Sequence, residues 1–169
     1  MVQKVKRAKT PQEALASLMR LCARSERSSG DALRLMRGWG LAEGDAAGVL
    51  ARLIKERFID DSRYAEAFVR EKMRLSGWGS YKIVAALRVK HIAQEVINEA
   101  MQQAAPSDMR ERLAALLARR MKTLKYKSAS DARQKLLRYA VSAGYDFSTA
   151  RECVDNITFE ADDDDSALF

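Results

Sequence analysis

The sequence predicts an all-α protein built from three tandem three-helix repeats that stack into an elongated, curved array. Apolar residues recur at the three- and four-residue spacing of helices along most of the chain. An apolar pattern that opens every third helix, at Leu41, Ile92 and Tyr145, returns after 51 and then 53 residues. A nearly constant interval of this size indicates repeated units that share a core with their neighbours.

The first predicted repeat covers residues 11–57. Thr10, Pro11 and Glu13 supply a cap, a proline in the first turn and the acidic member of a capping box, so a helix begins at Pro11. A second helix begins at Ser28 or Ser29 and stops at the 38–40 Gly-Trp-Gly turn. The third helix carries the apolar residues Ala46, Val49, Leu50, Leu53 and Ile54.

The second and third predicted repeats cover residues 58–105 and 106–158. Asp60-Asp61-Ser62 can cap the first helix of the second repeat, and Ser80 its second helix. In the third repeat, a long helix follows Ser107 and Ser130 caps the next one. Outside the repeats, we expect a basic, disordered N-terminal tail at residues 1–10 and an acidic C-terminal tail at 159–169.

The composition argues against catalysis and against a metal or cofactor. A chain of 169 residues can bury a core without a disulfide or a metal, and Cys22 and Cys153 lack the spacing of a zinc site, so both are interpreted as reduced core residues. The only histidine is His91, and no nucleophile, phosphate-loop or metalloprotease motif is present. We expect a monomeric, cytoplasmic protein that is not an enzyme, holds no cofactor and does not enter a membrane.

The charge distribution favours a polyanionic partner. The formal net charge is +7, and five acids lie together at 160–165 without a basic residue. Without them, the 23 acidic residues fall to 18 against 30 basic ones, a net charge of +12. A basic body binds polyanions, and the acidic tail either competes for that surface or only solubilises the chain.

Two segments, 70–90 and 110–127, each contain many basic residues and a single acidic one. Such runs are often no more than a solvated helix face, but the near absence of acids favours contact with phosphate. We therefore expect salt-sensitive DNA binding without base recognition. The candidate contacts with nucleic acid or its protein filament are Arg70, Lys72, Arg74, Lys82, Arg88, Lys90, Arg112, Arg119, Arg120 and Lys122.

The segment 58–65, Phe-Ile-Asp-Asp-Ser-Arg-Tyr-Ala, and Gly77-Trp78-Gly79 with Ile83 and Leu87 after it, resembles the signature of the bacterial RecX family. The similarity runs from about Leu15 to Ile157. Where the family commonly has Lys-Gly, this chain has Lys90-His91, so His91 is expected to adopt a left-handed conformation unless the turn differs. The signature residues with an expected structural role are Asp60, Asp61, Arg63, Tyr64, Gly77 and Gly79.

The resemblance implies three tandem three-helix repeats and a partner, the RecA filament on DNA. A RecX-like protein is expected to lodge in the filament groove and to inhibit the recombinase, ATPase and co-protease activities of RecA. Two alternatives stay open. One is a stand-alone DNA-binding regulator with repeats that act like helix-turn-helix units, and the other is a helical scaffold for another protein.

Overall fold

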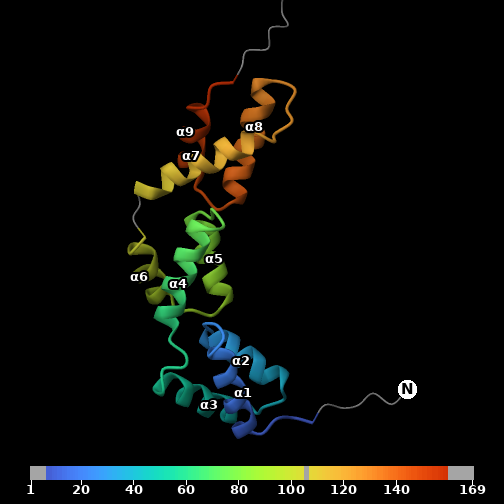
Figure 1. The fold of residues 1–169 in the computed structure, drawn as a ribbon, viewed down its shortest axis with the longest axis vertical. Helices are drawn as coiled ribbons and strands as arrows, with labels where there is room; N and C mark the ends of the chain where they lie inside the picture. The colour runs from blue at the N-terminus through green and yellow to red at the C-terminus, as the bar shows by residue number, and fades with distance from the viewer. Residues whose placement is uncertain (1–6, 105–106, 160–169) are drawn as a thin grey trace, which may run out of the picture. The chain divides into compact units, whose positions relative to one another are not determined.

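The computed structural model of the protein describes residues 7–104 and 107–159. Within these ranges the chain forms nine helices and no strand, as Figure 1 shows, which confirms the all-α prediction. The helices are α1 (Pro11–Cys22), α2 (Ser29–Gly38), α3 (Glu43–Lys55), α4 (Asp61–Arg74), α5 (Ser80–Val89), α6 (Gln94–Gln102), α7 (Ser107–Met121), α8 (Ala129–Ser142) and α9 (Phe147–Asp155). None of these helices combines the length and the apolar character needed to cross a bilayer.

The chain divides into two compact units. The first unit contains Met1–Phe68 and Ala86–Ala100, and the second contains Val69–Ala85 and Met101–Phe169. The division passes through α4, α5 and α6, so the helices of the predicted middle repeat contribute to both units. The residue boundaries of the three repeats therefore stay a prediction.

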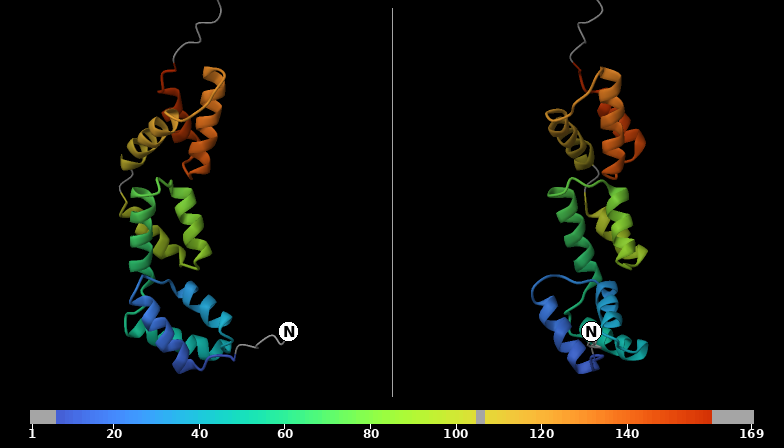
Figure 2. Two further views of the ribbon diagram at one scale, coloured as in Figure 1. Left: turned by 45° about the vertical axis from the view of Figure 1, so that its right-hand side comes forward. Right: turned by 90° about the vertical axis from the view of Figure 1, so that its right-hand side faces the viewer.

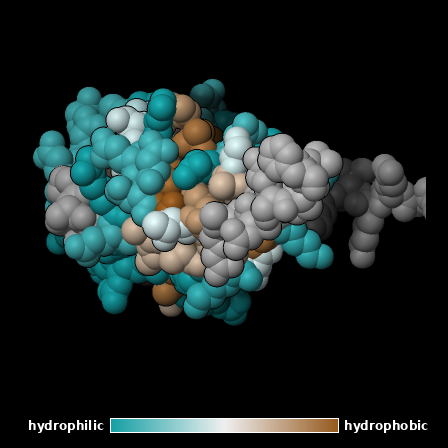
Figure 3. Space-filling view, turned by 90° about the horizontal axis from the view of Figure 1, so that it is seen from above, coloured by the Kyte–Doolittle hydropathy of each residue, from teal (hydrophilic) through white to brown (hydrophobic). Residues whose placement is uncertain are grey.

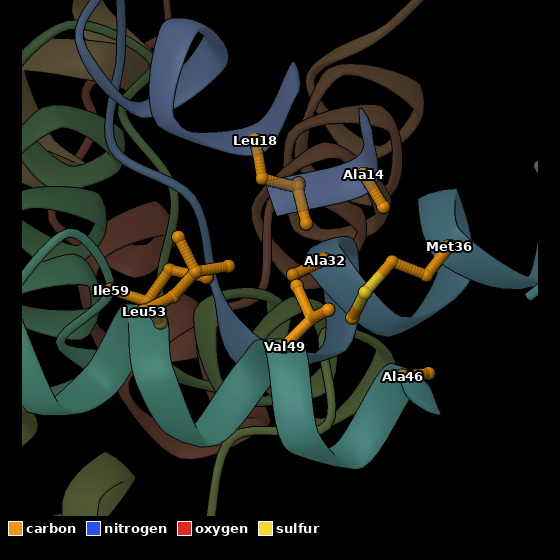
Figure 4. Close-up of a cluster of buried hydrophobic side chains, with 8 residues drawn as sticks. All are labelled: Ala14, Leu18, Ala32, Met36, Ala46, Val49, Leu53 and Ile59. Atoms are coloured by element: carbon orange, nitrogen blue, oxygen red, sulfur yellow. The ribbon is translucent and has the colours of Figure 1, made fainter. Parts of the chain in front are cut away.

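The core of the first unit lies between α1, α2 and α3. Leu18, Met36 and Leu53 are fully buried, one from each helix, and Ile59 packs beside them. Figure 4 shows that these side chains point toward one another. The three helices lie side by side in both views of Figure 2. Burial of each of these side chains stabilises the folded state by about 1.5–3 kcal/mol, because it removes apolar surface from water.

The core of the second unit lies between α7, α8 and α9. Leu113 and Leu117 from α7 and Leu136 from α8 are fully buried, and Val154 from α9 is nearly so. Phe159, the last described residue, packs against the edge of this cluster. The same arrangement of three amphipathic helices thus recurs at both ends of the described chain.

Helix starts follow the predicted chemistry at α1, α2 and α4. The predicted capping box at Thr10 and Glu13 is present. Two predicted caps are wrong by one or two residues. Ser80 is the first residue of α5 rather than its cap, and the cap of α8 is Ser128 instead of Ser130. Ser128 is extended and its hydroxyl accepts a hydrogen bond from a backbone amide in the first turn of α8, whereas Ser130 already lies inside the helix.

The turn after α2, α5 and α8 has the same conformation each time. Gly40, His91 and Gly144 have φ values of 79°, 57° and 97°. The amides of the next residues, Leu41, Ile92 and Tyr145, donate to the carbonyls of Met36, Leu87 and Ala140 at 3.1, 3.2 and 3.2 Å. This is a Schellman cap, which satisfies carbonyls at a helix end. The expectation that His91 is left-handed is confirmed.

In the first unit, the start of α2 meets the end of α5, and we call this contact the first-unit junction. The Ser28 hydroxyl donates to the Lys90 carbonyl at 3.4 Å, and the Lys90 ammonium reaches Asp31 at 2.9 and 3.1 Å. Gly30 lies so close that a Cβ there would overlap the Lys90 carbonyl. The amino end of one helix thus faces the carbonyl end of another, which is favourable for their dipoles.

In the second unit, the start of α5 meets the end of α8 in the same way, and we call this contact the second-unit junction. The Gly79 amide donates to the Ala143 carbonyl at 2.8 Å, and the Tyr81 amide donates to the Gly144 carbonyl at 3.0 Å. A Cβ on Gly79 would overlap the Gly144 backbone. Both junctions join helices of adjacent predicted repeats.

Residues 7–10, expected to belong to a disordered tail, make defined contacts with the first unit. The Lys9 amide donates to the Trp39 carbonyl at 3.0 Å, which is the carbonyl equivalent to Lys90 and Ala143 in the two junctions. The Lys9 ammonium lies 3.7 Å from the centre of the Trp39 ring and 2.8 Å from the Ser17 hydroxyl. This short segment therefore covers the end of α2. The rest of the predicted tail, residues 1–6, lies outside the described residues.

Candidate nucleic-acid interface

A basic hollow lies between α7, the loop that follows it and α8. It is a shallow hollow of about 580 Å³ that is widely open to solvent. The residues that line this basic hollow are Arg120, Thr123, Leu124, Lys125, Lys135, Arg138, Tyr139 and Ser142. Four of these eight side chains are cationic and none is acidic, so the hollow favours an anionic occupant.

Local contacts fix part of the basic hollow. The Lys135 ammonium donates to Asp131 at 2.7 Å and to the Lys125 carbonyl at 2.9 Å, so its charge is partly compensated. The Lys135 hydrogen bond, together with the amide of Lys127, lowers the pKa of the Asp131 carboxyl and keeps it ionised. Among the described residues, no carboxylate pairs with Arg120 or with the Lys125 and Arg138 side chains.

An aromatic ring adds a second mode of contact to the basic hollow. The Arg120 guanidinium lies 5.2 Å from the centre of the Tyr139 ring, and Tyr139 itself lines the hollow. Cations bind phosphate oxygens, and aromatic and guanidinium planes stack on unpaired bases. The arrangement can therefore hold a single strand without reading its sequence.

A second group of cations surrounds Trp78 in the second unit. The ammonium groups of Lys72 and Lys82 lie 5.4 and 4.5 Å from the centre of the Trp78 ring. The Lys72 ammonium also pairs with Glu71 at 2.9 Å. The Cβ of Lys82 packs against Gly144, two residues beyond the end of α8 that lines the basic hollow. The predicted contacts Lys72 and Lys82 are thus brought together on an aromatic ring.

Lys90, another predicted contact, has a different role within the fold. Its ammonium is held by Asp31, whose side chain is only 6% exposed. Burial alone raises the pKa of the Asp31 carboxyl, but hydrogen bonds from Lys90 and Arg34 outweigh burial and lower the pKa below its ordinary value. Because Lys90 neutralises the buried charge of Asp31, it is not part of the surface proposed to contact nucleic acid.

The other predicted contacts are spread over several helices. Arg88 is exposed and donates to Gln94 at 2.9 Å. Arg112 is half-buried on α7; burial raises the pKa of Tyr145, and the Arg112 guanidinium opposes that rise. The remaining predicted cations are exposed, on α4 for Arg70 and Arg74, and on α7 and its following turn for Arg119 and Lys122. Of the ten, only Arg120 lines the basic hollow.

The signature residues make contacts inside the fold. Asp60 caps α4 by accepting from the Arg63 amide at 3.0 Å, and Asp61 accepts from the Ser29 amide at 2.8 Å. The Arg63 guanidinium pairs with Glu26 at 2.6 Å. Tyr64 stacks on Phe68, and the Gly77 carbonyl accepts from the Tyr145 hydroxyl at 3.2 Å. With Gly79 at the second-unit junction, the signature residues other than Tyr64 each join segments that are distant in sequence or begin a helix.

Sequence reasoning missed Lys135, Arg138 and Tyr139 as possible contact residues. They lie in a segment with three basic residues and one acidic residue, a smaller excess than in 110–127. Their helical spacing of three and four residues places them on one side of α8. A search for cations at this spacing beside an aromatic residue could have found them.

The described residues offer no constellation for metal chemistry. Among them, no group of three or more His, Cys, Asp or Glu side chains is placed to hold a metal ion. Cys22 and Cys153 are half-buried, one in each unit, rather than fully buried as expected. Burial raises the pKa of both thiols, which disfavours the reactive thiolate.

The surface as a whole is rich in polar groups. Figure 3 shows one face that is mainly hydrophilic, with a smaller hydrophobic area near its middle. Large apolar side chains exposed elsewhere, such as Leu75 in the turn after α4 and Val89 at the end of α5, do not form one cluster in the sequence. Charge is therefore the strongest recognition feature among the described residues.

Comparison with known proteins identifies relatives of one kind. Residues 60–101 match the family described as RecX, second three-helix domain. The Regulatory protein RecX of Chromohalobacter salexigens is 32% identical over 80% of this chain and 87% of the relative. The Regulatory protein RecX of Lactobacillus johnsonii is 22% identical over 97% of this chain, which spans only 60% of that relative.

A solved structure shares the fold. The crystal structure of RecX from Lactobacillus salivarius superposes with a TM-score of 0.72 at 19% identity, and covers 86% of this chain and 94% of that one. This agreement supports the helical repeat architecture that the sequence predicted. The relatives are named as regulatory proteins, so their names indicate regulation rather than catalysis.

Proposed function

The chain belongs to the RecX family of regulatory proteins, and on that premise we propose that it is a non-catalytic regulator of the RecA recombinase. It binds the RecA filament on DNA in the cytoplasm and inhibits recombination, the ATPase and the co-protease activity. The observation that carries this proposal is the basic hollow. A modulator of a nucleoprotein filament needs a surface for phosphate that does not read bases.

The four cations of the basic hollow support contact with the strand inside the filament. Lys125 and Arg138 contribute charge without a carboxylate partner among the described residues, and Tyr139 provides a ring for stacking. Lys72 and Lys82 beside Trp78 supply a second basic and aromatic group in the same unit. Binding of this kind weakens as salt rises, because phosphate contact releases counterions.

The test is RecA ATPase and strand exchange on single-stranded DNA at increasing amounts of the protein. We expect inhibition near stoichiometric amounts, and we expect Lys125→Gln/Arg138→Gln to need about tenfold more protein for the same effect. The salt slope for single-stranded DNA should fall by about 1.4, since each lost phosphate contact removes about 0.7.

The matched control is Arg24→Gln/Lys55→Gln. It removes the same charge from two exposed side chains of the first unit that do not line the basic hollow. It should inhibit like the unaltered chain. If the unaltered chain leaves both RecA activities unaffected, the proposal fails, and sequence-selective binding to duplex without RecA would favour the stand-alone DNA-binding alternative.

A further inference from the structure

The last described residue, Phe159, is anchored against α8 and the loop that precedes it. Its ring meets Tyr126 edge to face, with 6.5 Å between the ring centres, and the Arg133 guanidinium lies 4.9 Å from the centre of the Phe159 ring. Neither Tyr126 nor Arg133 lines the hollow, and Arg133 projects from the side of α8 opposite to the residues that do. The chain therefore leaves the described fold at α8 and the loop before it, and the tail has to pass around α8 to reach the hollow.

The sequence beyond this anchor is complementary to the hollow. Residues 160–169 contain Glu160 and four aspartates at 162–165, with no lysine or arginine. The hollow carries four cations and no acidic lining residue. The negative tail and the positive hollow attract each other at low ionic strength, and this attraction is screened as the salt concentration rises.

The length of the tail is sufficient to reach the hollow. Along α8, the stretch from Arg133 to Ser142 rises about 14 Å, at about 1.5 Å per residue. The last aspartate, Asp165, lies six residues beyond Phe159 and can therefore reach up to about 20 Å from it, which is enough to pass around a helix about 10–12 Å in diameter. Because the anchor fixes one end of the tail, its carboxylates are held at a high local concentration, which favours even a weak contact.

We propose that the basic hollow is the docking surface of the chain's own acidic tail, residues 160–169. The carboxylates occupy the positions of phosphates, so docking masks the hollow and the polyanion must displace the tail. The inference rests on the proposed function only in naming DNA phosphate as the competitor. Docking itself needs no DNA.

The first experiment uses the full chain without DNA. We compare its ¹H–¹⁵N spectrum with that of Asp162→Asn/Asp163→Asn/Asp164→Asn/Asp165→Asn, which keeps the length of the tail. Amide signals of Thr123, Lys125 and Tyr139 should differ at 50 mM salt and coincide at 500 mM salt. Signals of Arg24 and Lys55 in the first unit should not change. Unchanged signals at the hollow would overturn the proposal whatever the protein does to RecA.

The second experiment measures affinity for fluorescent oligo-dT. The four-asparagine chain should bind about fivefold more tightly than the unaltered chain at 50 mM salt. This gain should be lost in the Lys125→Gln/Arg138→Gln background and kept in the Arg24→Gln/Lys55→Gln background. An equal gain in both backgrounds would mean general repulsion of DNA by the tail and would overturn docking at the hollow. If no chain binds DNA, the proposed function fails and the spectra alone decide the docking.

Discussion

The first-unit junction and the second-unit junction both join the start of one helix to the end of another, but through different contacts. In each, the start of a helix meets the end of the equivalent helix of the next predicted repeat, through a glycine that approaches backbone. The first-unit junction adds charge, because Asp31 binds Lys90. The second-unit junction is joined by two backbone hydrogen bonds, and Lys82 stands where Asp31 stands in the first.

The start of α8 shows what an acidic residue does without such a junction. Ser128 and Asp131 repeat the cap and acid of Ser28 and Asp31, 100 residues later. Asp131 binds Lys135 on its own helix, and its side chain is 29% exposed against 6% for Asp31. The same local motif therefore becomes a buried link in one place and a surface ion pair in the other.

This comparison teaches that the backbone approach is shared and the side-chain charge is variable. It can be tested unit by unit, because Trp39 lies in the first unit and Trp78 in the second, and the chain has two tryptophans. A Trp78→Phe chain reports the first unit through Trp39. A Trp39→Phe chain reports the second unit through Trp78.

The largest effect is expected from the close glycines. Gly30→Ala should destabilise the first unit, and Gly79→Ala the second, each by about 3 kcal/mol, because the new Cβ overlaps backbone that cannot turn away. Denaturant unfolding followed by the tryptophan of each unit measures both.

The control for the glycine variants is Gly48→Ala. Gly48 lies inside α3 with no atom near the position of a Cβ, so this change should stabilise the first unit by about 0.5–1 kcal/mol. If Gly79→Ala also stabilised its unit, the close approach of Gly79 to the Gly144 backbone would not be needed for the second-unit junction.

The next largest effect on stability is expected from Asp31, and it should differ from the effect of Asp131. Asp31→Asn should destabilise the first unit by about 2 kcal/mol at pH 7, since hydrogen bonds to charged groups contribute about 1.5–3 kcal/mol. Asp131→Asn should cause a much smaller loss in the second unit, because its ion pair is exposed. Equal losses would remove the distinction between a junction pair and a surface pair.

The pH dependence of the Asp31 pair has a definite sign. The folded pKa of Asp31 lies below its ordinary value of 3.8, so the unfolded chain takes up the proton first as pH falls. The contribution is fully present above about pH 5 and is lost as pH falls through the folded pKa. The stability difference between the unaltered chain and Asp31→Asn should therefore shrink below about pH 4. A difference that stayed constant to pH 2.5 would contradict the role of the ionised carboxylate.

Much of the fold could be predicted because its signals are local. Thr10 and Glu13 formed the expected capping box, and His91 took the expected left-handed conformation, since caps and turns depend on a few neighbouring residues. The shift from Ser130 to Ser128 reflects a choice between two nearby serines, which depends on the backbone around each hydroxyl. At α5 the helix begins at Ser80 itself, so the residue before it is Gly79. The turn interval of 51 and 53 residues already indicated the repeat.

The candidate site was harder to predict because its contacts are distant in sequence. Lys90 looked like a surface cation in a basic run, and nothing near it indicates a partner 59 residues away. Arg138 lies in a segment with a smaller basic excess than 110–127, although it lines the same hollow as Arg120. Local charge identifies a basic region, whereas packing decides which of its cations face a partner.

The smallest expected effect concerns His91 at the end of α5. His91 has φ 57°, where Gly40 and Gly144 occupy the equivalent turns. A left-handed conformation costs a residue with a Cβ about 1–2 kcal/mol, and glycine loses about 0.5–1 kcal/mol through the entropy of the unfolded chain. His91→Gly should therefore stabilise the first unit by about 0.5 kcal/mol, measured by Trp39 fluorescence in the Trp78→Phe chain.

His91→Ala is the matched control, because it removes the exposed ring and keeps the Cβ that causes the strain. It should leave the stability of the first unit nearly unchanged. The Cβ of His91 also lies 3.1 Å from the position of a Cβ on Gly30, but the Lys90 carbonyl is nearer still. Adding His91→Gly to Gly30→Ala should therefore fail to restore stability. Full rescue would show that side-chain crowding, and not approach to the backbone, makes Gly30 necessary at the first-unit junction.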